Sequence, residues 1–261
     1  MAGKIRIWDF YCIMSFMNAF ILGSQDVFEY DRAYSLLTRE LGKVVAIARS
    51  VRKPQSKLAG HLDAPHFSWV EVIATSKGWQ ITQALEQLAY ARIRKNRDAL
   101  KAVLQCSQFL NVFLPALVGS YEFQHIVGKQ QGDEEKVFML WGDFLDHMEL
   151  YAEQLNETDF DFIRAQCVLR GLSLLGFLPD VAVCNSCGKQ FSARGAYLAD
   201  NQLVCDACAV SLRAGANSIS YSVLKTIQQI MSGTWVLKDH YAKAVTRCAD
   251  YFERQSEQFM L

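Results

Sequence analysis

Four cysteines in two closely spaced pairs constrain the fold of this 261-residue chain more than any other feature. Both pairs have the form Cys-x-x-Cys: Cys184 with Cys187, and Cys205 with Cys208, with 17 residues between the pairs. This spacing is within the range of a four-cysteine zinc site, in which each of two tight turns supplies two thiolates to a tetrahedron. Because all four ligands are protein thiolates, no position is open for water. We therefore predict one structural, non-catalytic Zn²⁺ per chain.

The remaining cysteines favour a metal over the alternatives, which are two disulfides or a redox-active Cys-x-x-Cys. Cys12, Cys106, Cys167 and Cys248 are scattered through apolar stretches. Buried free thiols of this kind are typical of a reducing compartment. The apolar run from Phe10 to Leu22 lacks a small-residue cleavage site and is too short to span a bilayer. We expect a cytoplasmic protein that does not bind membranes.

Residues 18 to 85 have the pattern of short β-strands. Segments rich in β-branched, aromatic and small residues lie at 18–23, 33–39, 44–51, 67–75 and 78–84. Trp79 and Ile81 alternate with polar residues, and Val45 and Ile47 alternate with alanines, which is the period of half-buried strands. Five short strands in roughly 70 residues suit a small barrel, because closure removes the exposed edges. The sequence therefore predicts an OB-type barrel.

From about Tyr90 onward the hydrophobic period becomes helical. The clearest stripe has the spacing i, i+3, i+4 and i+7, and consists of Val137, Leu140, Trp141, Phe144, Leu145, Met148, Tyr151 and Leu155. A second helix is predicted at 159–175, with Gly176 as its stop signal. Two more are predicted near 221–231 and 240–258.

These patterns predict an α+β multi-domain fold. The expected domains are an OB-type nucleic-acid-binding barrel at 17–86, a helical domain at 87–180, an embedded four-cysteine zinc module at 181–212, and C-terminal helices at 213–261 that pack on the helical domain. Residues 1–16 are either a poorly ordered extension or lie upstream of a start at Met14 or Met17.

Charge is balanced over the whole chain, with 27 basic and 27 acidic residues, but it is locally uneven. Seven cations lie between residues 32 and 57 against the single acid Glu40: Arg32, Arg39, Lys43, Arg49, Arg52, Lys53 and Lys57. Tyr30 and Tyr34 accompany them. On a barrel, cations that follow phosphates and aromatic rings that stack on bases form a single-strand binding groove. We predict that these seven residues bind DNA; a solvated charged face is the alternative interpretation.

A second basic cluster opens the helical region, with only Asp98 opposing it: Arg92, Arg94, Lys95, Arg97 and Lys101. This cluster could extend the DNA path, bind an acidic peptide, or be an exposed helix face. By contrast, residues 130–163 contain ten acids against Lys136 alone, which disfavours phosphate binding there.

Sequence motifs for catalysis are absent. The chain has no G-x-x-x-x-G-K phosphate loop, no H-E-x-x-H and no G-x-S-x-G, and its five histidines are dispersed. We therefore predict no catalytic residues and a protein that is not an enzyme.

Several segments resemble the bacterial recombination mediator family RecO. They are Phe28-Glu-Tyr-Asp-Arg32, Leu36-Leu-Thr-Arg-Glu40, Gly42-Lys43, Arg52-Lys53-Pro-Gln-Ser-Lys57, Gly60-His-Leu62, and Leu174-Leu-Gly-Phe-Leu-Pro179 leading into the first cysteine pair. The similarity covers nearly the whole chain from about Ala19. Some members lack zinc cysteines, whereas this sequence keeps all four.

The resemblance implies a non-enzymatic role in the repair of DNA damage by recombination. Family members bind single- and double-stranded DNA, anneal complementary strands and help load recombinase onto DNA coated by single-strand-binding protein. The implied partners are RecR and the acidic, apolar C-terminal tail of that coating protein, in a bacterial cytoplasm and at the nucleoid during repair. We assign the tail to the second basic cluster, Arg92 to Lys101, because cations and a pocket suit a peptide C-terminus.

Two other functions remain open. A zinc-ribbon factor of the transcription or translation machinery would also bind nucleic acid. A metal-dependent hydrolase would need a water-accessible metal and would show turnover.

Overall fold

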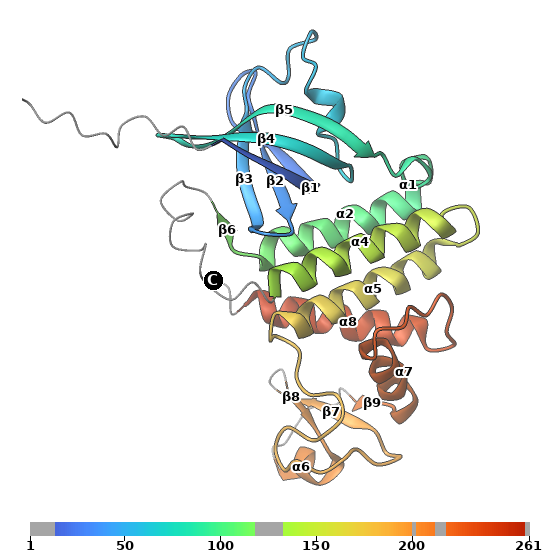
Figure 1. Cartoon of the computed structure of the whole chain (residues 1–261). Coiled ribbons are helices and arrows are strands. Elements are labelled where there is room, and N and C mark those ends of the chain that lie inside the picture. Colours follow the sequence, from blue (N-terminus) through green and yellow to red (C-terminus); the bar gives the residue numbers. More distant parts are fainter. Residues whose placement is uncertain (1–13, 118–132, 200–201, 212–217, 259–261) are drawn as a thin grey trace, which may run out of the picture. The chain divides into compact units, whose positions relative to one another are not determined.

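The computed structural model describes residues 14–117, 133–199, 202–211 and 218–258 (Figure 1). The chain forms two compact units. The first contains the described residues up to Ala89, Leu114–Leu117 and the start of helix α4 as far as Phe138. The second contains Tyr90–Phe113 and the described residues from Met139 onward. Within these ranges, no helix combines the length and apolar composition that a membrane span requires.

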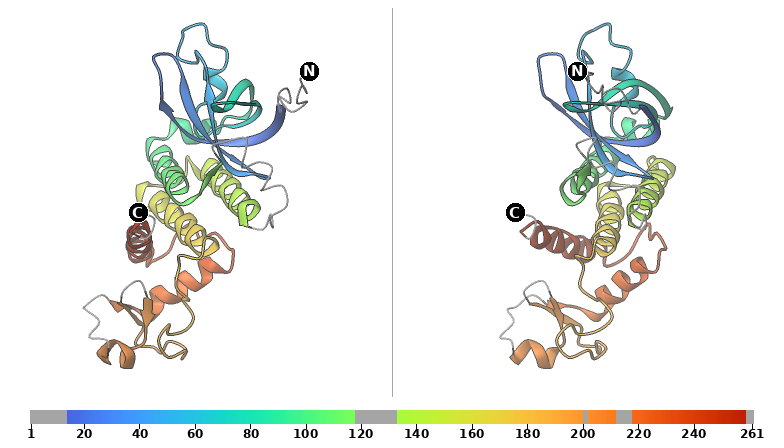
Figure 2. Two further views of the ribbon diagram at one scale, coloured as in Figure 1. Left: turned by 90° about the vertical axis from the view of Figure 1, so that its left-hand side faces the viewer. Right: turned by 60° about the vertical axis from the view of Figure 1, so that its left-hand side comes forward.

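The first unit is built on a closed five-stranded barrel, as predicted (Figures 1 and 2). Its strands are β1 (Met14–Asp26), β2 (Arg32–Thr38), β3 (Gly42–Ala48), β4 (Phe67–Thr75) and β5 (Gly78–Leu88). They follow the cyclic order β1-β2-β3-β5-β4, in which only the β3–β5 pair is parallel. The short strand β6 (Ala116–Leu117) pairs with β3.

Strand β1 closes the barrel because it pairs with two neighbours along its length. Residues 14–20 pair with β4 and residues 19–26 with β2, with a register shift between Ile21 and Gly23. Such a shift bends the strand and increases its twist, as closure requires. Because β1 begins at Met14, the last three residues of the predicted 1–16 extension belong to the barrel, while residues 1–13 lie outside the described residues.

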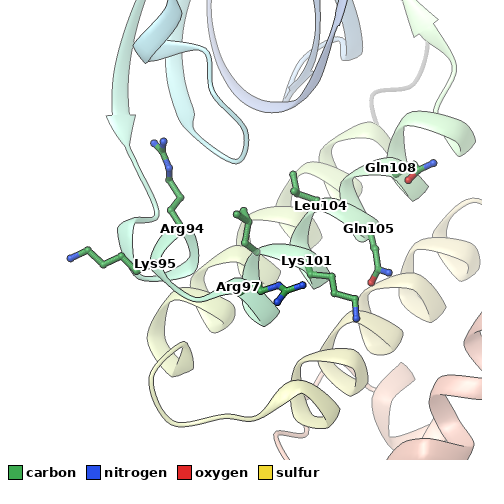
Figure 3. Close-up of a pocket in the computed structure, with 8 residues that line it drawn as sticks. Arg94, Lys95, Arg97, Lys101, Leu104, Gln105 and Gln108 are labelled. Carbon is green, nitrogen blue, oxygen red and sulfur yellow. The ribbon is translucent and has the colours of Figure 1, made fainter.

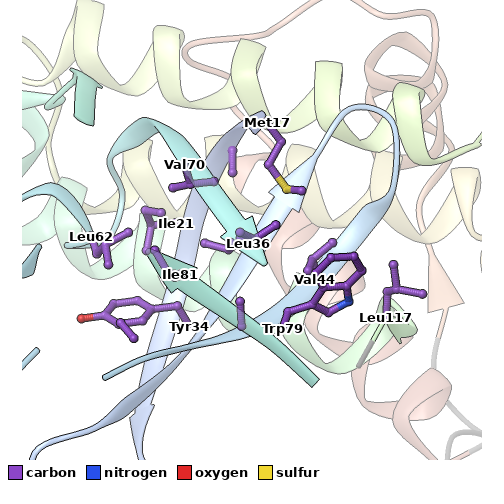
Figure 4. Packing of buried hydrophobic residues seen from close by; sticks show 14 of the residues in the cluster. Met17, Ile21, Tyr34, Leu36, Val44, Leu62, Val70, Trp79, Ile81 and Leu117 are labelled. Atoms are coloured by element: carbon purple, nitrogen blue, oxygen red, sulfur yellow. The ribbon is translucent and has the colours of Figure 1, made fainter. Parts of the chain in front are cut away.

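The barrel interior is filled by alternate residues of each strand (Figure 4). Trp79 and Ile81 are buried, as their alternation predicts. On β3 the alternation also holds, and the alanines take the inner face: Val44, Ala46 and Ala48 enter the core, whereas Val45 and Ile47 lie half-buried outside it. The interior of a small barrel is narrow, so small side chains can occupy inward positions while larger ones face outward.

The second unit packs helices around α5 (Glu157–Leu174), which contacts α2 (Arg97–Phe113) and α8 (Ala242–Glu257). These helices lie side by side in Figures 1 and 2. An Asn156–Asp159 capping box begins α5, and Gly176, at φ +77°, follows its end as predicted. The remaining helices are α1 (Ala91–Lys95), α4 (Asp133–Tyr151), α6 (Asp206–Ser211) and α7 (Tyr221–Met231). The predicted stripe of α4 is buried from Val137 to Met148.

Buried polar side chains of α5 fix the elements around it. Arg164 forms ion pairs with Asp250 at 2.5 Å and with Glu253 at 3.5 Å, both on α8. Gln166 exchanges two hydrogen bonds with the backbone of Val236, in the connection between α7 and α8. Both side chains thereby have partners, and Arg164 avoids the large cost of an unpaired buried charge. The domain boundaries drawn from the sequence stay predictions.

Candidate metal centre and nucleic-acid interface

The four-cysteine cluster lies in a small module with its own three-stranded sheet. Strand β7 (Ala196–Ala199) pairs with β8 (Gln202–Val204) and with β9 (Ser218–Ile219). The first cysteine pair forms a tight turn in which Gly188, at φ +71°, donates its N–H to the carbonyl of Cys184 at 2.8 Å. The second pair lies where β8 ends and α6 begins. The sheet therefore brings together two turns that are far apart in the sequence.

The geometry of the cluster suits a metal ion. The sulfur atoms of Cys184, Cys187, Cys205 and Cys208 all lie within 4.8 Å of one another. The Cys187 and Cys205 sulfurs are 3.8 Å apart, and the described part of the chain contains no disulfide. All four sulfurs thus lie close enough together to hold one metal ion.

The pKa values of these thiols also fit a cation-binding site. Burial raises the pKa of Cys184, but backbone N–H groups of Cys205, Cys187 and Ser186 donate to its sulfur and bring the pKa down to about 6. Ser186 lowers the pKa of Cys208, but hydrogen bonds from the neighbouring thiols raise it to about 12. Four crowded thiols cannot all ionise without a cation, whereas a bound metal removes that repulsion.

The structure divides the basic stretch of the barrel between two ends. Arg32 pairs in register with Asp26 on β1 and with Ala48 on β3. The β3–β4 connection, which carries Arg49, Arg52, Lys53 and Lys57, starts at this end. Arg39 lies in the β2–β3 turn at the other end, about 20 Å along β2 at the usual strand rise. The seven predicted DNA-binding residues therefore do not form one continuous patch.

At the first end, the loop between β1 and β2 (residues 27–31) lies against the start of the β3–β4 connection, and we call these two segments the barrel tip. Arg52 forms an ion pair with Asp26 at 3.3 Å and donates to the carbonyl of Glu29 at 3.0 Å. The Lys53 ammonium lies over the Tyr30 ring, 5.1 Å from its centre. Among the described residues, the exposed Arg49 and Lys57 have no ion-pair partner.

At the second end, neither predicted cation projects freely from the surface. Arg39 binds the carboxylate of Glu135, which belongs to α4. Lys43 is buried, and burial lowers the pKa of its ammonium. Contact with a phosphate would therefore require Arg39 to exchange partners and Lys43 to become exposed.

Sequence reasoning missed two features of the barrel tip. Asp26 and Asp31 precede the basic stretch and fold back onto it. Asp26 pairs with both Arg32 and Arg52, so part of the positive charge is neutralised. The aromatic residues also differ from expectation: Tyr34 lies in the barrel core, while Phe28 is 67% exposed. Phe28 could have been noticed as an aromatic residue outside the predicted strand segments, in the connection before 33–39.

The second basic cluster lines an open groove of about 570 Å³ on α1 and α2 (Figure 3). Its lining residues are Arg94, Lys95, Arg97, Leu100, Lys101, Leu104, Gln105 and Gln108. Leu104 is 44% exposed and gives the groove an apolar element. Lys101 forms an ion pair with Glu157 at 2.9 Å. Arg92, the fifth predicted residue, does not line the groove.

The position of α1 is fixed by a carboxylate. Glu149 of α4 accepts hydrogen bonds from the N–H groups of Arg92 and Ile93, at 3.0 Å from each. Asn96 caps α2 by accepting from Asp98 and Ala99. The cations of the groove are thus carried on two fixed helices rather than on a loop.

Comparison with known proteins identifies two matching family models. The one described as recombination protein O N terminal matches residues 14–88, and the one described as recombination protein O C terminal matches residues 132–247. Three similar proteins are each named DNA repair protein RecO. That of Pelobacter propionicus is 26% identical over 196 residues, covering 74% of this chain and 71% of the relative. That of Thermodesulfovibrio yellowstonii is 25% identical over 225 residues, covering 84% and 81%. That of Symbiobacterium thermophilum is 24% identical over 241 residues, covering 88% and 85%.

Proposed function

Because the chain belongs to the RecO family of DNA repair proteins, we propose that it is a non-enzymatic recombination mediator. It binds single- and double-stranded DNA, anneals complementary strands and helps load recombinase onto DNA coated by single-strand-binding protein. It acts in the cytoplasm, at the nucleoid during repair, and RecR is a partner. The observation that carries the proposal is an OB-type barrel whose tip presents exposed cations, in a chain of this family.

The DNA contacts are assigned first to the barrel tip. Arg49, Arg52, Lys53 and Lys57 can reach phosphates, while Arg32 is less exposed. Arg39 and Lys43 contribute less because of their present partners and burial. Phosphate contacts release counterions, so the affinity is independent of base sequence and falls with salt. Annealing then needs no chemical step. Holding two strands close together raises their local concentration while the cations reduce phosphate repulsion.

The metal is assigned as zinc, held by Cys184, Cys187, Cys205 and Cys208. Four sulfurs placed about 2.3 Å from a tetrahedral zinc lie about 3.8 Å apart, which fits the distance between Cys187 and Cys205. With four thiolate ligands the ion supplies folding energy and no reactive water.

The tail of single-strand-binding protein is assigned to the groove on α1 and α2. Arg94, Lys95, Arg97 and Lys101 offer cations for acidic side chains and the terminal carboxylate. Leu100 and Leu104 offer apolar contact for a bulky side chain at the end of the tail. Lys101 would exchange its ion pair with Glu157 for the peptide.

An annealing assay tests the proposal. Complementary strands coated by single-strand-binding protein are mixed without ATP, with the parent protein or with the variant Arg49→Ala/Arg52→Ala/Lys53→Ala. The variant should bind single strands at least tenfold more weakly at low salt and should anneal slowly. The slope of log affinity against log salt should fall by roughly 0.7 for each phosphate that the variant no longer neutralises.

The control Lys77→Ala/Lys189→Ala/Lys243→Ala removes the same charge from exposed lysines outside the barrel tip and should behave like the parent. Equal binding and annealing by both variants would show that the barrel tip is only a solvated face. If the parent protein does not anneal the coated strands without ATP, the mediator role itself is refuted.

A further inference from the structure

The loop at the barrel tip exposes apolar side chains. Residues 27–31 connect β1 to β2, and within them Val27 is 39%, Phe28 67% and Tyr30 43% exposed. Phe28 is the most exposed aromatic side chain among the described residues. Keeping large rings in water is unfavourable, so an exposed apolar site that is rimmed by polar groups indicates a ligand surface.

The backbone of this loop is held in place by several hydrogen bonds. The N–H groups of Val27 and Phe28 donate to the carbonyl of Asp31, at 3.2 and 3.5 Å. The N–H of Arg52 donates to the carbonyl of Tyr30 at 3.1 Å, and the N–H of Ser50 donates to the Asp31 carboxylate at 2.7 Å. The loop is therefore fixed against the β3–β4 connection, and a ligand need not order it upon binding.

Acids neutralise part of the positive charge at the barrel tip. Arg32 and Arg52 share the Asp26 carboxylate, at 2.7 and 3.3 Å. Lys53 lies over one side of the Tyr30 ring. These pairs weaken the attraction for phosphate at this surface, and charge does not account for the exposed rings.

We propose that Phe28 and Tyr30 form a base-stacking site that makes the barrel tip select unstacked single strands over duplex DNA. This inference rests on the proposed DNA-binding function and names its preferred substrate. A base stacks on the open face of Phe28, Tyr30 supports a neighbouring base or sugar, and Lys53 and Arg52 reach the flanking phosphates.

The selectivity follows from where the faces of the bases are. Every base has a π-face that can stack on an aromatic ring, so the contact is independent of sequence. In a duplex those faces are covered by neighbouring base pairs, and a ring can reach one only by unstacking a step, which costs a few kcal/mol. The rings should therefore add affinity for single strands and almost none for duplex.

Fluorescence anisotropy of the full chain tests this with three labelled ligands of equal length: an oligothymidine, a duplex, and an abasic strand that has phosphates but no bases. Phe28→Ala should weaken oligothymidine binding roughly tenfold and change duplex and abasic binding less than about twofold. Tyr30→Ala should act in the same direction with a smaller effect. Phe28→Trp should keep the preference for oligothymidine over duplex, because indole offers an equal or larger stacking face.

The matched control is Phe16→Ala. Phe16 is a barrel aromatic that is 55% exposed but stacks on Trp69, outside the barrel tip, so its removal should leave all three affinities unchanged. Equal losses on oligothymidine and duplex in Phe28→Ala would overturn the inference, because the ring would then only shape the loop. Unchanged binding of all three ligands would also overturn it and indicate a protein-binding surface. Failure of the proposed DNA binding gives a different result: Arg49→Ala/Arg52→Ala/Lys53→Ala would then bind DNA as tightly as the parent protein does.

Discussion

The two basic clusters of this chain look alike in sequence and differ in structure. In the barrel stretch, Arg32, Arg39 and Arg52 are each bound to an acid, and the cations are divided between two ends of the barrel. In the α1–α2 cluster, consecutive helical turns carry Arg97 and Lys101 along one groove, where Lys101 pairs with Glu157. Figure 3 shows Arg97, Lys101 and Gln105 on one side of α2.

The difference shows that cation density along a sequence does not measure surface potential. A strand hairpin sends neighbouring cations to opposite ends and brings acids from outside the stretch beside them. A helix keeps residues at i and i+4 on the same face, so a basic helical run stays a basic surface. We therefore expect the barrel tip to depend on stacking as well as charge, and the groove to depend mainly on charge.

The largest effect is expected from removing the metal. This experiment also tests whether the barrel tip or the groove on α1 and α2 depends on the zinc module. Cys205→Ser should lose the zinc, unfold the module and lower the thermal stability, because a structural zinc contributes on the order of 10 kcal/mol to folding its own site. Binding of DNA and of the tail peptide should change less than about threefold. Metal analysis, calorimetry and anisotropy measure these quantities.

Cys248→Ala removes a thiol outside the cluster and should retain the metal. Well under one zinc per chain in the parent protein, with intact disulfides, would contradict the zinc assignment. Loss of DNA binding together with the metal would mean that the two surfaces are not independent of the module.

A smaller effect is expected in the groove. Arg94→Ala/Arg97→Ala should weaken a fluorescent tail peptide at least tenfold, since two cations that would bind carboxylates are removed, and should leave single-strand affinity within about twofold. Arg92→Ala is the matched control because Arg92 belongs to the same cluster but does not line the groove. If the double variant binds the peptide as tightly as the parent protein does, the tail binds elsewhere.

The smallest effect separates the two ends of the barrel. Arg49→Ala should lower single-strand affinity about three- to fivefold and reduce the salt slope by roughly 0.7 unit, as expected when one phosphate is no longer neutralised. Arg39→Ala should change both by less than about twofold, because Arg39 is already paired with Glu135. Salt titrations of both variants decide this. A larger effect for Arg39 would show that its ion pair opens upon DNA binding.

Local patterns predicted much of this molecule. Segments rich in β-branched, aromatic and small residues, two of them with period-2 alternation, located all five barrel strands to within a few residues. The 3.6-residue stripe located the buried face of α4 from Val137 to Met148. The paired Cys-x-x-Cys motifs identified the four residues that the structure brings together. These predictions succeed because strand alternation, helix amphipathicity and a chelating turn all depend on neighbours within about seven residues.

Other features depended on contacts between distant segments. Tyr34 and Lys43 have polar groups and lie in a basic stretch, yet both are buried. Strand register places Tyr34 in the barrel core. Val45 and Ile47 face outward because the narrow interior takes Ala46 and Ala48 instead. Glu135 neutralises Arg39 across 96 residues of sequence.

By itself, the sequence determined the type of the barrel strands and of the longer helices, the four cysteines that come together, and the family to which the chain belongs. Only the tertiary structure decided which cations are exposed, which aromatic ring leaves the core and which acids lie beside the barrel tip. The physical reason is that helix and strand periodicity arises within one segment of chain, whereas surface potential and exposure are sums over all segments that meet at a point.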